Sequence, residues 1–418
     1  MLNKEQNKRL TRIGPGTPAG RLQRNYWFPV AAVSELTKRP SKKVRLLGED
    51  LVRYRDRAGR YGLLAERCPH RSASLAYGIA EHEGLRCMYH GWLFDQQGRC
   101  LEQPNEPEDS TFKDRIKTTA YRVEDLGGLL FAYLGPEPAP LLPRYDLFMR
   151  QDVIRTIGVA VVPANWVQIM ENSLDPTHLE WLHGRYFEQL WQLQGRDMKN
   201  WAFSKHHLKI GFDIFEYGII KRRVLVGQTE ENDDWAIGHP VIFPNMLRVG
   251  DGALHTFQIR VPMDDTHTYH VWYSCFIKPE HVQVPEDYPI SFYTVPIQDE
   301  TGQYITDYVD GQDIMAWASQ GEITDRSIEH LGTTDKGIIL YRKLVQQEIA
   351  RAERGEDTMC VLRDPAKNKC IDLPQEKNKY SADASMFKAA REWNTRYAPN
   401  LEEILSFLTP RETSLAVE

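Results

Sequence analysis

The chain has 418 residues, of which 41% are hydrophobic and 26% are charged. This composition is ordinary for a globular protein, and the length allows two or three domains. The net charge of −6 argues against nucleic-acid binding as a bulk property, so small molecules or other proteins are the expected partners. The polar N-terminus lacks the apolar core of a signal peptide, and no apolar run approaches the roughly 20 residues that span a bilayer. We therefore expect a cytoplasmic protein without membrane contact.

Residues 1–24 are predicted to form an N-terminal arm, a short helix followed by the Gly/Pro loop GPGTPAG. From residue 25 the sequence reads as short strands separated by turn signals. These segments are YWFPVAAV, KKVRLLG, EDLVRYRD, YGLLAE, the hairpin-like GWLFDQQGRC and YRVEDLGGLLFAYLG. Four prolines in the eight residues PEPAPLLP mark a linker. An all-β domain is therefore predicted over residues 25–138.

Residues 139–418 mix helical and strand patterns. NWVQIMENSLDPTHLEWLH, TDKGIILYRKLVQQEIARAERG and ASMFKAAREWNTRYAPNLEEILSFL have helical character. LKIGFDIFEYGIIKRRVLVG reads as strands, and ALHTFQIRVPMDDTHTYHVWYSCFIK reads as a hairpin turning at Asp264-Asp265. The predicted fold class is α+β: an all-β N-terminal domain, then an α+β domain with an antiparallel sheet flanked by helices.

Six cysteines are too few for a disulfide scaffold. Two of them have a histidine at metal-ligand spacing, Cys68 with His70 in C-x-H and Cys87 with His90 in C-x-x-H. Buried free thiols are expected for the other four, which are Cys100, Cys275, Cys360 and Cys370.

The two Cys–His pairs allow a zinc site or an iron–sulfur site. Zinc sites with two Cys and two His usually group the two Cys and then the two His. One Cys and one His on each loop suits a Rieske 2Fe–2S centre, in which two Cys hold one iron and two His hold the other. Pro69 stiffens the first loop, and Gly91 follows the last ligand where the backbone must turn tightly. The loops CPHRSASLAYG and CMYHGWLFDQQG resemble those of the Rieske domain.

A second metal site is indicated by ENSLDPTHLEWLH, residues 171–183. Non-haem iron(II) oxygenases bind iron with two histidines and one carboxylate and leave positions open for dioxygen and substrate. His178 and His183 are five residues apart, about 140° around a regular helix, so an undistorted helix would not direct both at one ion. A helix end or a π-type turn is therefore predicted there. The alternative is two unrelated histidines on a partly buried helix.

Together the two motifs resemble the α subunit of Rieske non-haem iron oxygenases, the ring-hydroxylating and demethylating family. LTRIGPGTPAG, ENSLDPTHLEWLHG and DRSIEHLGTTDKGIILYRKL are similar to the phthalate dioxygenase branch, whose members contain α subunits only. The resemblance implies a Rieske 2Fe–2S cluster and a mononuclear Fe(II). It also implies a homotrimer or hexamer, and an NAD(P)H-dependent reductase with flavin and 2Fe–2S, or a ferredoxin, as electron donor.

The implied reaction is hydroxylation of an aromatic substrate, most often an aromatic carboxylate, with dioxygen. Two alternatives stay open: mono-oxygenation or demethylation of another small molecule, and a non-catalytic Rieske electron carrier. The resemblance places the family's Asp-x-x-His-x-x-x-x-His motif on Asp175, His178 and His183.

The third iron ligand in the family is a distant aspartate. Asp313, in GQDIMAWAS, matches that position best, because the ligand there follows an acidic or amide residue and opens a helix. Asp325 is second, although an ion pair with Arg326 is the more plausible role for it. Asp307 and Asp310 are the remaining candidates.

Two further residues receive roles from the resemblance. Asp175 would bridge His178 and the Rieske ligand His90 of a neighbouring subunit through its carboxylate, with helix N-capping as the alternative. Asn172 would line the iron pocket.

An anionic substrate would need Arg or Lys in the pocket. Alternation along one strand places Lys221 and Arg223 on one face and Arg222 on the other. Arg248 and Arg260 are further candidates, and a solvated strand face is the alternative for each. Candidate apolar walls, which core packing explains equally well, are Phe203, Phe212, Ile214, Phe243, Met315 and Trp317. The basic segment 38–60 is either solvated surface or a docking site for an acidic ferredoxin or reductase.

Overall fold

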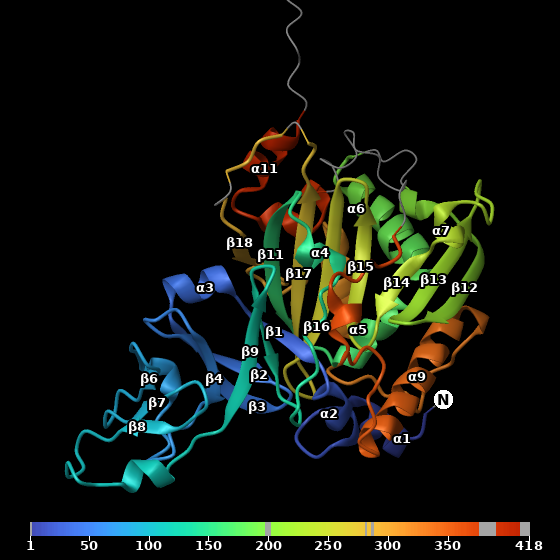
Figure 1. The fold of residues 1–418 in the computed structure, drawn as a ribbon. Helices are drawn as coiled ribbons and strands as arrows, with labels where there is room; N and C mark the ends of the chain where they lie inside the picture. Colours follow the sequence, from blue (N-terminus) through green and yellow to red (C-terminus); the bar gives the residue numbers. More distant parts are fainter. Residues whose placement is uncertain (1, 197–201, 281, 286–287, 376–389, 410–418) are drawn as a thin grey trace, which may run out of the picture.

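The computed structural model describes residues 2–196, 202–280, 282–285, 288–375 and 390–409 (Figure 1). An elongated β domain extends from one corner of a larger α+β domain (Figure 1). None of the described helices is long and apolar enough to cross a membrane.

The first domain is built on a six-stranded antiparallel sheet with the order β1-β10-β9-β4-β3-β2. Its strands are β1 (Trp27–Ala32), β2 (Ser41–Leu46), β3 (Glu49–Arg55), β4 (Tyr61–Ala65), β9 (Ala120–Leu126) and β10 (Leu129–Tyr133). A smaller sheet is inserted between β4 and β9 and lies at the tip of the domain (Figure 1). It contains β5 (Ile79–Ala80), β6 (Leu85–Arg86), β7 (Leu93–Phe94) and β8 (Cys100–Glu102). The strands predicted in this region are confirmed.

The second domain contains an eight-stranded sheet with the order β12-β13-β14-β15-β16-β17-β11-β18. All neighbouring strands are antiparallel except β11 and β18. The bounds are β11 (Val153–Val162), β12 (His207–Phe215), β13 (Gly218–Leu225), β14 (His239–Ile242), β15 (Met246–Asp251), β16 (Leu254–Pro262), β17 (Thr268–Ile277) and β18 (Ser291–Thr294). The predicted hairpin is β16–β17, and its turn contains Asp264-Asp265.

Helices cover this sheet and complete the predicted α+β fold (Figure 1). The main ones are α5 (Trp166–Ser173), α6 (Phe187–Leu193), α8 (Val309–Ser319), α9 (Lys336–Glu353) and α11 (Leu401–Leu408). Short helices α3 (Val33–Lys38), α4 (Asp146–Met149) and α7 (Asp233–Ala236) lie between strands. The predicted C-terminal helical segment begins at residue 384, and its part up to residue 389 lies outside the described residues.

The helices of the N-terminal arm pack on the second domain, while Arg24 at the end of the arm pairs with Glu49 of the first. It forms α1 (Lys4–Thr11), as predicted, and a second helix α2 (Pro18–Gln23), which replaces part of the predicted loop. Two residues explain why this second helix forms. Thr17 caps it by accepting a hydrogen bond from the Gly20 N–H, and Pro18 occupies its first turn. Contacts with α5 and α9 bury Leu10 completely.

One hydrophobic core runs through both domains, since Leu130 of the first and Phe257 of the second belong to the same cluster of buried side chains. The proline-rich linker is part of this packing, because the Leu141 N–H donates to the Leu362 carbonyl at 2.9 Å. Of the four cysteines expected to be buried thiols, Cys100 and Cys275 are buried. The expectation is wrong for Cys370, which is exposed, and only partly met by Cys360, which is half-buried, since both follow α9 in irregular surface chain.

Candidate metal centres and substrate pocket

The four Rieske-type residues lie on two neighbouring loops at the tip of the first domain. Cys68 and His70 follow β4, and Cys87 and His90 lie between β6 and β7. Backbone hydrogen bonds close each loop, from Ser72 N–H to the Cys68 carbonyl and from Gly91 N–H to the Cys87 carbonyl. Gly91 has φ +78°, the tight turn expected after the last ligand.

The two cysteines of these loops are buried, and the two histidines lie nearer the surface. Cys68 and Cys87 are 2% and 3% exposed, whereas His70 is exposed and its ring centroid lies 4.5 Å from that of His90. Burial, with a smaller contribution from the adjacent Cys87, raises the pKa of Cys68 to about 11. The Cys68 thiol therefore stays protonated unless a cation replaces its proton. Two inner thiols and two outer imidazoles fit the two irons of a Rieske cluster.

The second cluster begins where α5 ends. His178 immediately precedes a distorted helical turn, the π-helix η3 (Leu179–Tyr186), and His183 lies within it. This confirms the predicted π-type turn, which brings the two rings to a centroid distance of 5.2 Å. The predicted third ligand joins them from α8: Asp313 Oδ1 lies 3.2 Å from His183 Nε2 and 3.7 Å from His178 Nε2.

The protonation of this cluster suits a divalent cation. Burial lowers the pKa of His178 to about 4, which leaves it a neutral imidazole. Burial works to raise the pKa of Asp313, but the His183 and His178 rings hold it below its ordinary value. Burial works to lower the pKa of His183, but the Asp313 carboxylate raises it above its ordinary value, so a bound cation would replace a proton on this ring. One atom from each of the three side chains lies within 4.8 Å of the others, and two imidazoles with one carboxylate are the donor set of non-haem iron(II) sites.

His183 is oriented by the residue next to Asp313. The Gln312 Nε2 donates to the Thr306 carbonyl at 3.1 Å, which directs Gln312 Oε1 towards His183. His183 Nδ1–H then donates to Gln312 Oε1 at 2.9 Å. This hydrogen bond fixes the tautomer that presents the His183 Nε2 lone pair to a metal.

The other three aspartates lie away from the two histidines. Asp307 pairs with Arg396 at the surface, and buried Asp310 accepts hydrogen bonds from Trp272 and Asn394. The expected pair of Asp325 with Arg326 is wrong. Asp325 is exposed and accepts from Ser327, because the Arg326 guanidinium turns inward to a buried carboxylate on α5.

Asp175 contacts His178 through its backbone. The His178 Nδ1–H donates to the Asp175 carbonyl oxygen at 2.5 Å, while the Asp175 carboxylate lies 3.9 Å from that nitrogen. The same carboxylate accepts from Thr177 N–H and Oγ at 2.8 and 2.7 Å, a local turn just before His178, which is itself the N-cap residue of η3. The bridge from the Asp175 carboxylate to His90 of a neighbouring subunit stays a prediction.

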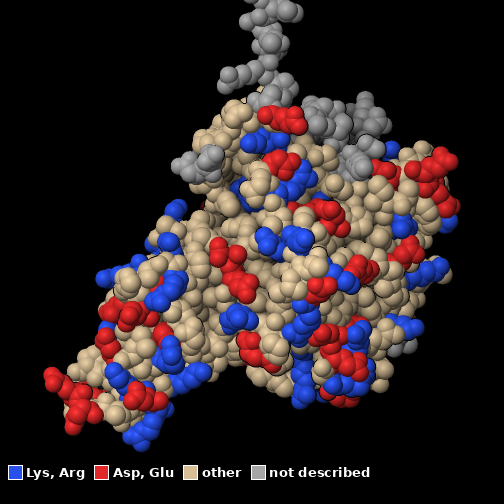
Figure 2. Space-filling view, in the orientation of Figure 1, with Lys and Arg blue, Asp and Glu red and all other residues tan. Residues whose placement is uncertain are grey.

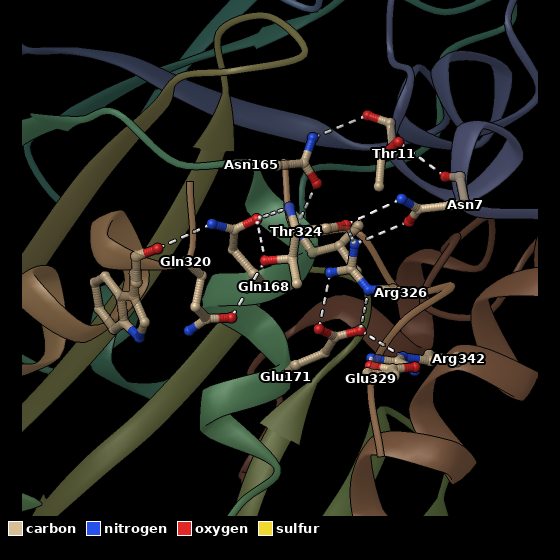
Figure 3. A network of polar contacts seen from close by, with 12 residues as sticks. Asn7, Thr11, Asn165, Gln168, Glu171, Gln320, Thr324, Arg326, Glu329 and Arg342 are labelled. Carbon is tan, nitrogen blue, oxygen red and sulfur yellow. Dashed lines mark hydrogen bonds and ion pairs between the residues drawn. The ribbon is translucent and has the colours of Figure 1, made fainter. Parts of the chain in front are cut away.

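A network of buried polar side chains holds α5 against α8 (Figure 3). The Gln168 Nε2 donates to the Trp317 and Gly321 carbonyls at 2.9 and 2.7 Å, and its Oε1 accepts two hydrogen bonds from Thr324. Gln168 therefore ties together the helix that leads to His178 and the helix that carries Asp313.

A charged cluster continues this network beyond Gln168 (Figure 3). Glu171 accepts from the fully buried Arg326 at 2.9 and 2.8 Å and from Arg342 at 2.6 Å. Arg342 also pairs with Glu329, and Arg326 reaches Asn7 of the N-terminal arm at 3.0 Å. Two carboxylates and two guanidinium groups therefore balance each other in the interior next to the candidate iron site.

The three-residue cluster opens into a cavity of about 90 Å³ that β13, β15 and β16 also line. Asn172 lines this cavity as expected, with Leu247 and Val249 among its apolar walls. Of the six predicted apolar side chains only Phe203 lines it. The other five do not: Phe243 lines a separate cavity, and Phe212, Ile214, Met315 and Trp317 line neither.

Three cationic side chains from the sheet also line the cavity. Lys221 and Arg223 face it from β13, while Arg222 points to the opposite face and pairs with Asp213, which confirms the predicted alternation. Arg223 is ion-paired to Asp234 at 2.7 Å. Arg260 on β16 is the third cation, whereas Arg248 is paired with Asp146 outside the cavity.

Arg260 is 1% exposed and, among the described residues, forms no ion pair. Its Nη1 and Nη2 donate to the Gln258 carbonyl and Oε1 at 3.0 and 2.7 Å, and its Nε makes no hydrogen bond there. Burial lowers the pKa of Arg260. A buried guanidinium without a direct counter-ion, on the wall of a cavity, favours an anionic ligand.

Known proteins share both halves of this architecture. Residues 26–120 match the Rieske [2Fe-2S] domain family, and residues 300–403 match the family described as LigXa C-terminal domain like. The chain is 42% identical over 377 residues to the 5,5'-dehydrodivanillate O-demethylase oxygenase subunit of Sphingobium sp. (strain NBRC 103272 / SYK-6), across 90% of this chain and 87% of that protein. It is 30% identical over 397 residues to the phthalate 4,5-dioxygenase oxygenase subunit of Pseudomonas putida, across 86% and 89%. The chain is a Rieske non-haem iron oxygenase α subunit.

This oxygenase belongs to the phthalate dioxygenase branch, and its cofactors are a Rieske 2Fe–2S cluster and a mononuclear iron, so the zinc alternative is wrong. Solved structures agree in fold. Pseudomonas putida CBB5 NdmA superposes with a TM-score of 0.58 at 20% identity, across 81% of this chain and 94% of that one. The oxygenase of a carbazole 1,9a-dioxygenase ferredoxin complex superposes with a TM-score of 0.57 at 18% identity, across 88% and 98%.

Ion pairs neutralise only part of the basic segment 38–60, since Lys38, Arg39 and Arg57 are exposed and form no ion pair among the described residues. Lys42 and Arg53 both pair with Glu35, and Arg45 pairs with Asp50. Acidic and basic side chains are also interspersed over the visible face of the oxygenase (Figure 2). The docking of an acidic redox partner at this segment therefore stays a prediction.

Proposed function

We propose that the oxygenase uses dioxygen and reductase-delivered electrons from NAD(P)H to hydroxylate an aromatic carboxylate. The observation that carries this proposal is the position of Arg260, a buried cation on the wall of the cavity that contains His178, His183 and Asp313. Relatives named for phthalate and phenoxybenzoate support it, because these are anions of aromatic acids.

In this proposal the metals are held by the two clusters already described. Cys68, His70, Cys87 and His90 would hold the Rieske cluster, and His178, His183 and Asp313 would hold the Fe(II). When bound, the cluster supplies single electrons and the iron activates dioxygen.

The remaining steps belong to the protein. Arg260 binds the substrate carboxylate and orients the ring, while apolar walls such as Phe203 and Leu247 exclude water from it. Gln312 keeps the His183 Nε2 directed at the metal. Asn172 borders the same space, where its amide contacts the bound substrate.

The subunits are proposed to form a homotrimer or a hexamer. The Rieske loops lie at the tip of the first domain, at the far end of the molecule from α5 (Figure 1). Electron transfer would therefore run from one subunit to its neighbour, with the Asp175 carboxylate as the bridge between His178 and the neighbour's His90. A reductase with flavin and 2Fe–2S, or a ferredoxin, supplies the electrons, and the cytoplasm is the proposed location.

O-demethylation is a second candidate reaction, favoured by the relative named 5,5'-dehydrodivanillate O-demethylase at 42% identity. Turnover under labelled dioxygen separates the two reactions. Two labelled oxygen atoms in the aromatic product indicate ring dihydroxylation. An unlabelled phenol released together with formaldehyde indicates O-demethylation, because the hydroxylated methyl carbon leaves with the new oxygen.

The metal assignment is tested by iron and acid-labile sulfide analysis of anaerobically purified protein. About three irons and about two sulfides per chain are expected. His178→Ala should lose about one iron and keep the Rieske absorbance, while the exposed His82→Ala, as control, should lose none. About two irons in wild type after iron loading, with no change in His178→Ala, would leave only an electron carrier.

The substrate class is tested at Arg260. Arg260→Met should raise the KM for an aromatic carboxylate about 10- to 100-fold, since a hydrogen bond to a charged group contributes about 1.5–3 kcal/mol. Arg222→Met, on the opposite face of the sheet, is the matched control and should leave KM unchanged. Equal loss of activity with a carboxylate and with its methyl ester would contradict carboxylate binding by Arg260.

A further inference from the structure

β12 is the end strand of the large sheet, and Figure 1 shows it at the edge farthest from β18. Its partner is β13, and no other described strand pairs with its outer edge. Every second residue of such a strand directs its N–H and C=O groups away from the sheet. An open edge of this length is a template for another strand unless something blocks or covers it.

The side chains of β12 are symmetric about Gly211. Its two neighbours, Ile210 and Phe212, are both apolar and half-buried. Beyond them Ile214 is 52% exposed and Leu208 is 60% exposed, but Leu208 lies in a β-bulge between His207 and Lys209, so the symmetry holds over Lys209–Asp213. A strand of this pattern placed antiparallel to itself brings apolar residues against apolar residues.

The charged residues of β12 follow the same symmetry with opposite sign. Lys209 lies two residues before Gly211 and pairs with Glu230 at 2.7 Å. Asp213 lies two residues after it and pairs with Arg222 at 2.6 Å. The side chains of Lys209 and Asp213 are 49% and 61% exposed, so both charges remain accessible beside their own partners.

We propose that the β12 edges of two copies of this chain pair antiparallel about a twofold axis at Gly211. In this register Lys209 faces Asp213 of the other copy, and Ile210 faces Phe212. Charges then alternate across the contact, from Arg222 and Asp213 of one copy to Lys209 and Glu230 of the other. The twofold axis repeats this favourable arrangement on its other side. At the axis the Trp235 ring of each copy packs over its own Gly211, 3.0 Å from where a Cβ would lie.

A second copy fits this edge better than an unrelated strand. β12 carries both a cation, Lys209, and an anion, Asp213. A second β12 placed antiparallel therefore pairs both charges at once, as a contact between identical surfaces requires. The contact is small compared with a stable interface of roughly 1,600 Å². Three such contacts between two of the proposed trimers would act together and produce a particle of six chains.

The test measures the mass of the holoenzyme by native mass spectrometry and analytical ultracentrifugation. Wild type should contain an even number of chains, six if the proposed trimer forms and two if it does not. Lys209→Asp and Asp213→Lys should each halve that number, because like charges then face each other. The double variant, Lys209→Asp with Asp213→Lys, should restore it. Lys343→Asp, an exposed reversal on α9, is the control and should leave the mass unchanged.

Two outcomes overturn the proposal: wild type with one or three chains, or single variants that keep the wild-type mass. An unchanged Rieske absorbance in every variant shows that each is folded. A wild-type mass of two chains would support the β12 contact and contradict the trimer, so the two proposals fail separately.

Discussion

Gln312 should decide how tightly the mononuclear iron is held. Its Oε1 accepts the His183 Nδ1–H at 2.9 Å, and Gln312 is fully buried. Gln312→Leu keeps similar bulk but removes the acceptor, which leaves a buried N–H without a partner and allows the ring to turn. Loss of such a hydrogen bond costs about 1–3 kcal/mol. Outer-shell partners of metal-bound histidines typically change metal affinity by about 10- to 100-fold, which falls in the same range.

The assay is anaerobic equilibrium dialysis of the oxygenase against a competing chelator, with iron counted per chain. The Rieske absorbance serves as an internal control because its loops lie in the other domain. Gln320→Leu is the matched variant, an exposed glutamine at the end of the same helix that contacts none of the three candidate ligands. Iron affinity of Gln312→Leu within twofold of wild type, or an equal loss in Gln320→Leu, would refute the reasoning.

Three further outcomes are expected from the packing. Glu171→Gln should destabilise the oxygenase by about 3–5 kcal/mol in chemical denaturation near pH 7, because it leaves the buried Arg326 without a carboxylate. Burial acts to raise the pKa of Glu171, but Arg326 and Arg342 hold it below its usual value near 4.5. The stability that Glu171 contributes is thus complete above about pH 4.5 and is lost as the pH falls through the lowered pKa. The difference in free energy of unfolding between wild type and Glu171→Gln should therefore shrink in acid. A difference that stays constant with pH would contradict this. Gly337→Ala should lower the thermal midpoint, with a cost of about 1–3 kcal/mol, because the added Cβ would lie 2.3 Å from Phe212 Cε1.

Local patterns predicted the longer strands well. β12, β13, β16 and β17 alternate strongly or end in clear turns, so sequence period and turn chemistry were sufficient. β5, β6 and β7 contain two residues each and carry no period of their own. The α2 helix was missed because its Gly and Pro read as loop, although Thr17 and Pro18 are also a helix start signal.

Some features of the candidate site could also be predicted from the local sequence, and others could not. The Cys–His spacing and the Asp-x-x-His-x-x-x-x-His motif gave the expected ligands, and the five-residue spacing of His178 and His183 gave the π-type turn. The role of Gln312 could have been suspected from its place before Asp313. The isolation of Arg260 and the partner of Arg326 could not, because Glu171 lies 155 residues away from Arg326. Such contacts depend on the fold rather than on the local sequence.

The docking of the N-terminal arm on α9 determines when the oxygenase can finish folding during synthesis. Arg9 reaches Glu353 and Asn7 reaches Arg326, so the arm waits for partners that are translated hundreds of residues later. The Rieske domain that follows the arm has all the strands of its sheets by residue 133 and can form on the ribosome. Until α9 emerges, Leu10 and the rest of the arm's apolar face stay exposed on the nascent chain. The N-terminal arm therefore reaches its place only after about 350 residues have been made.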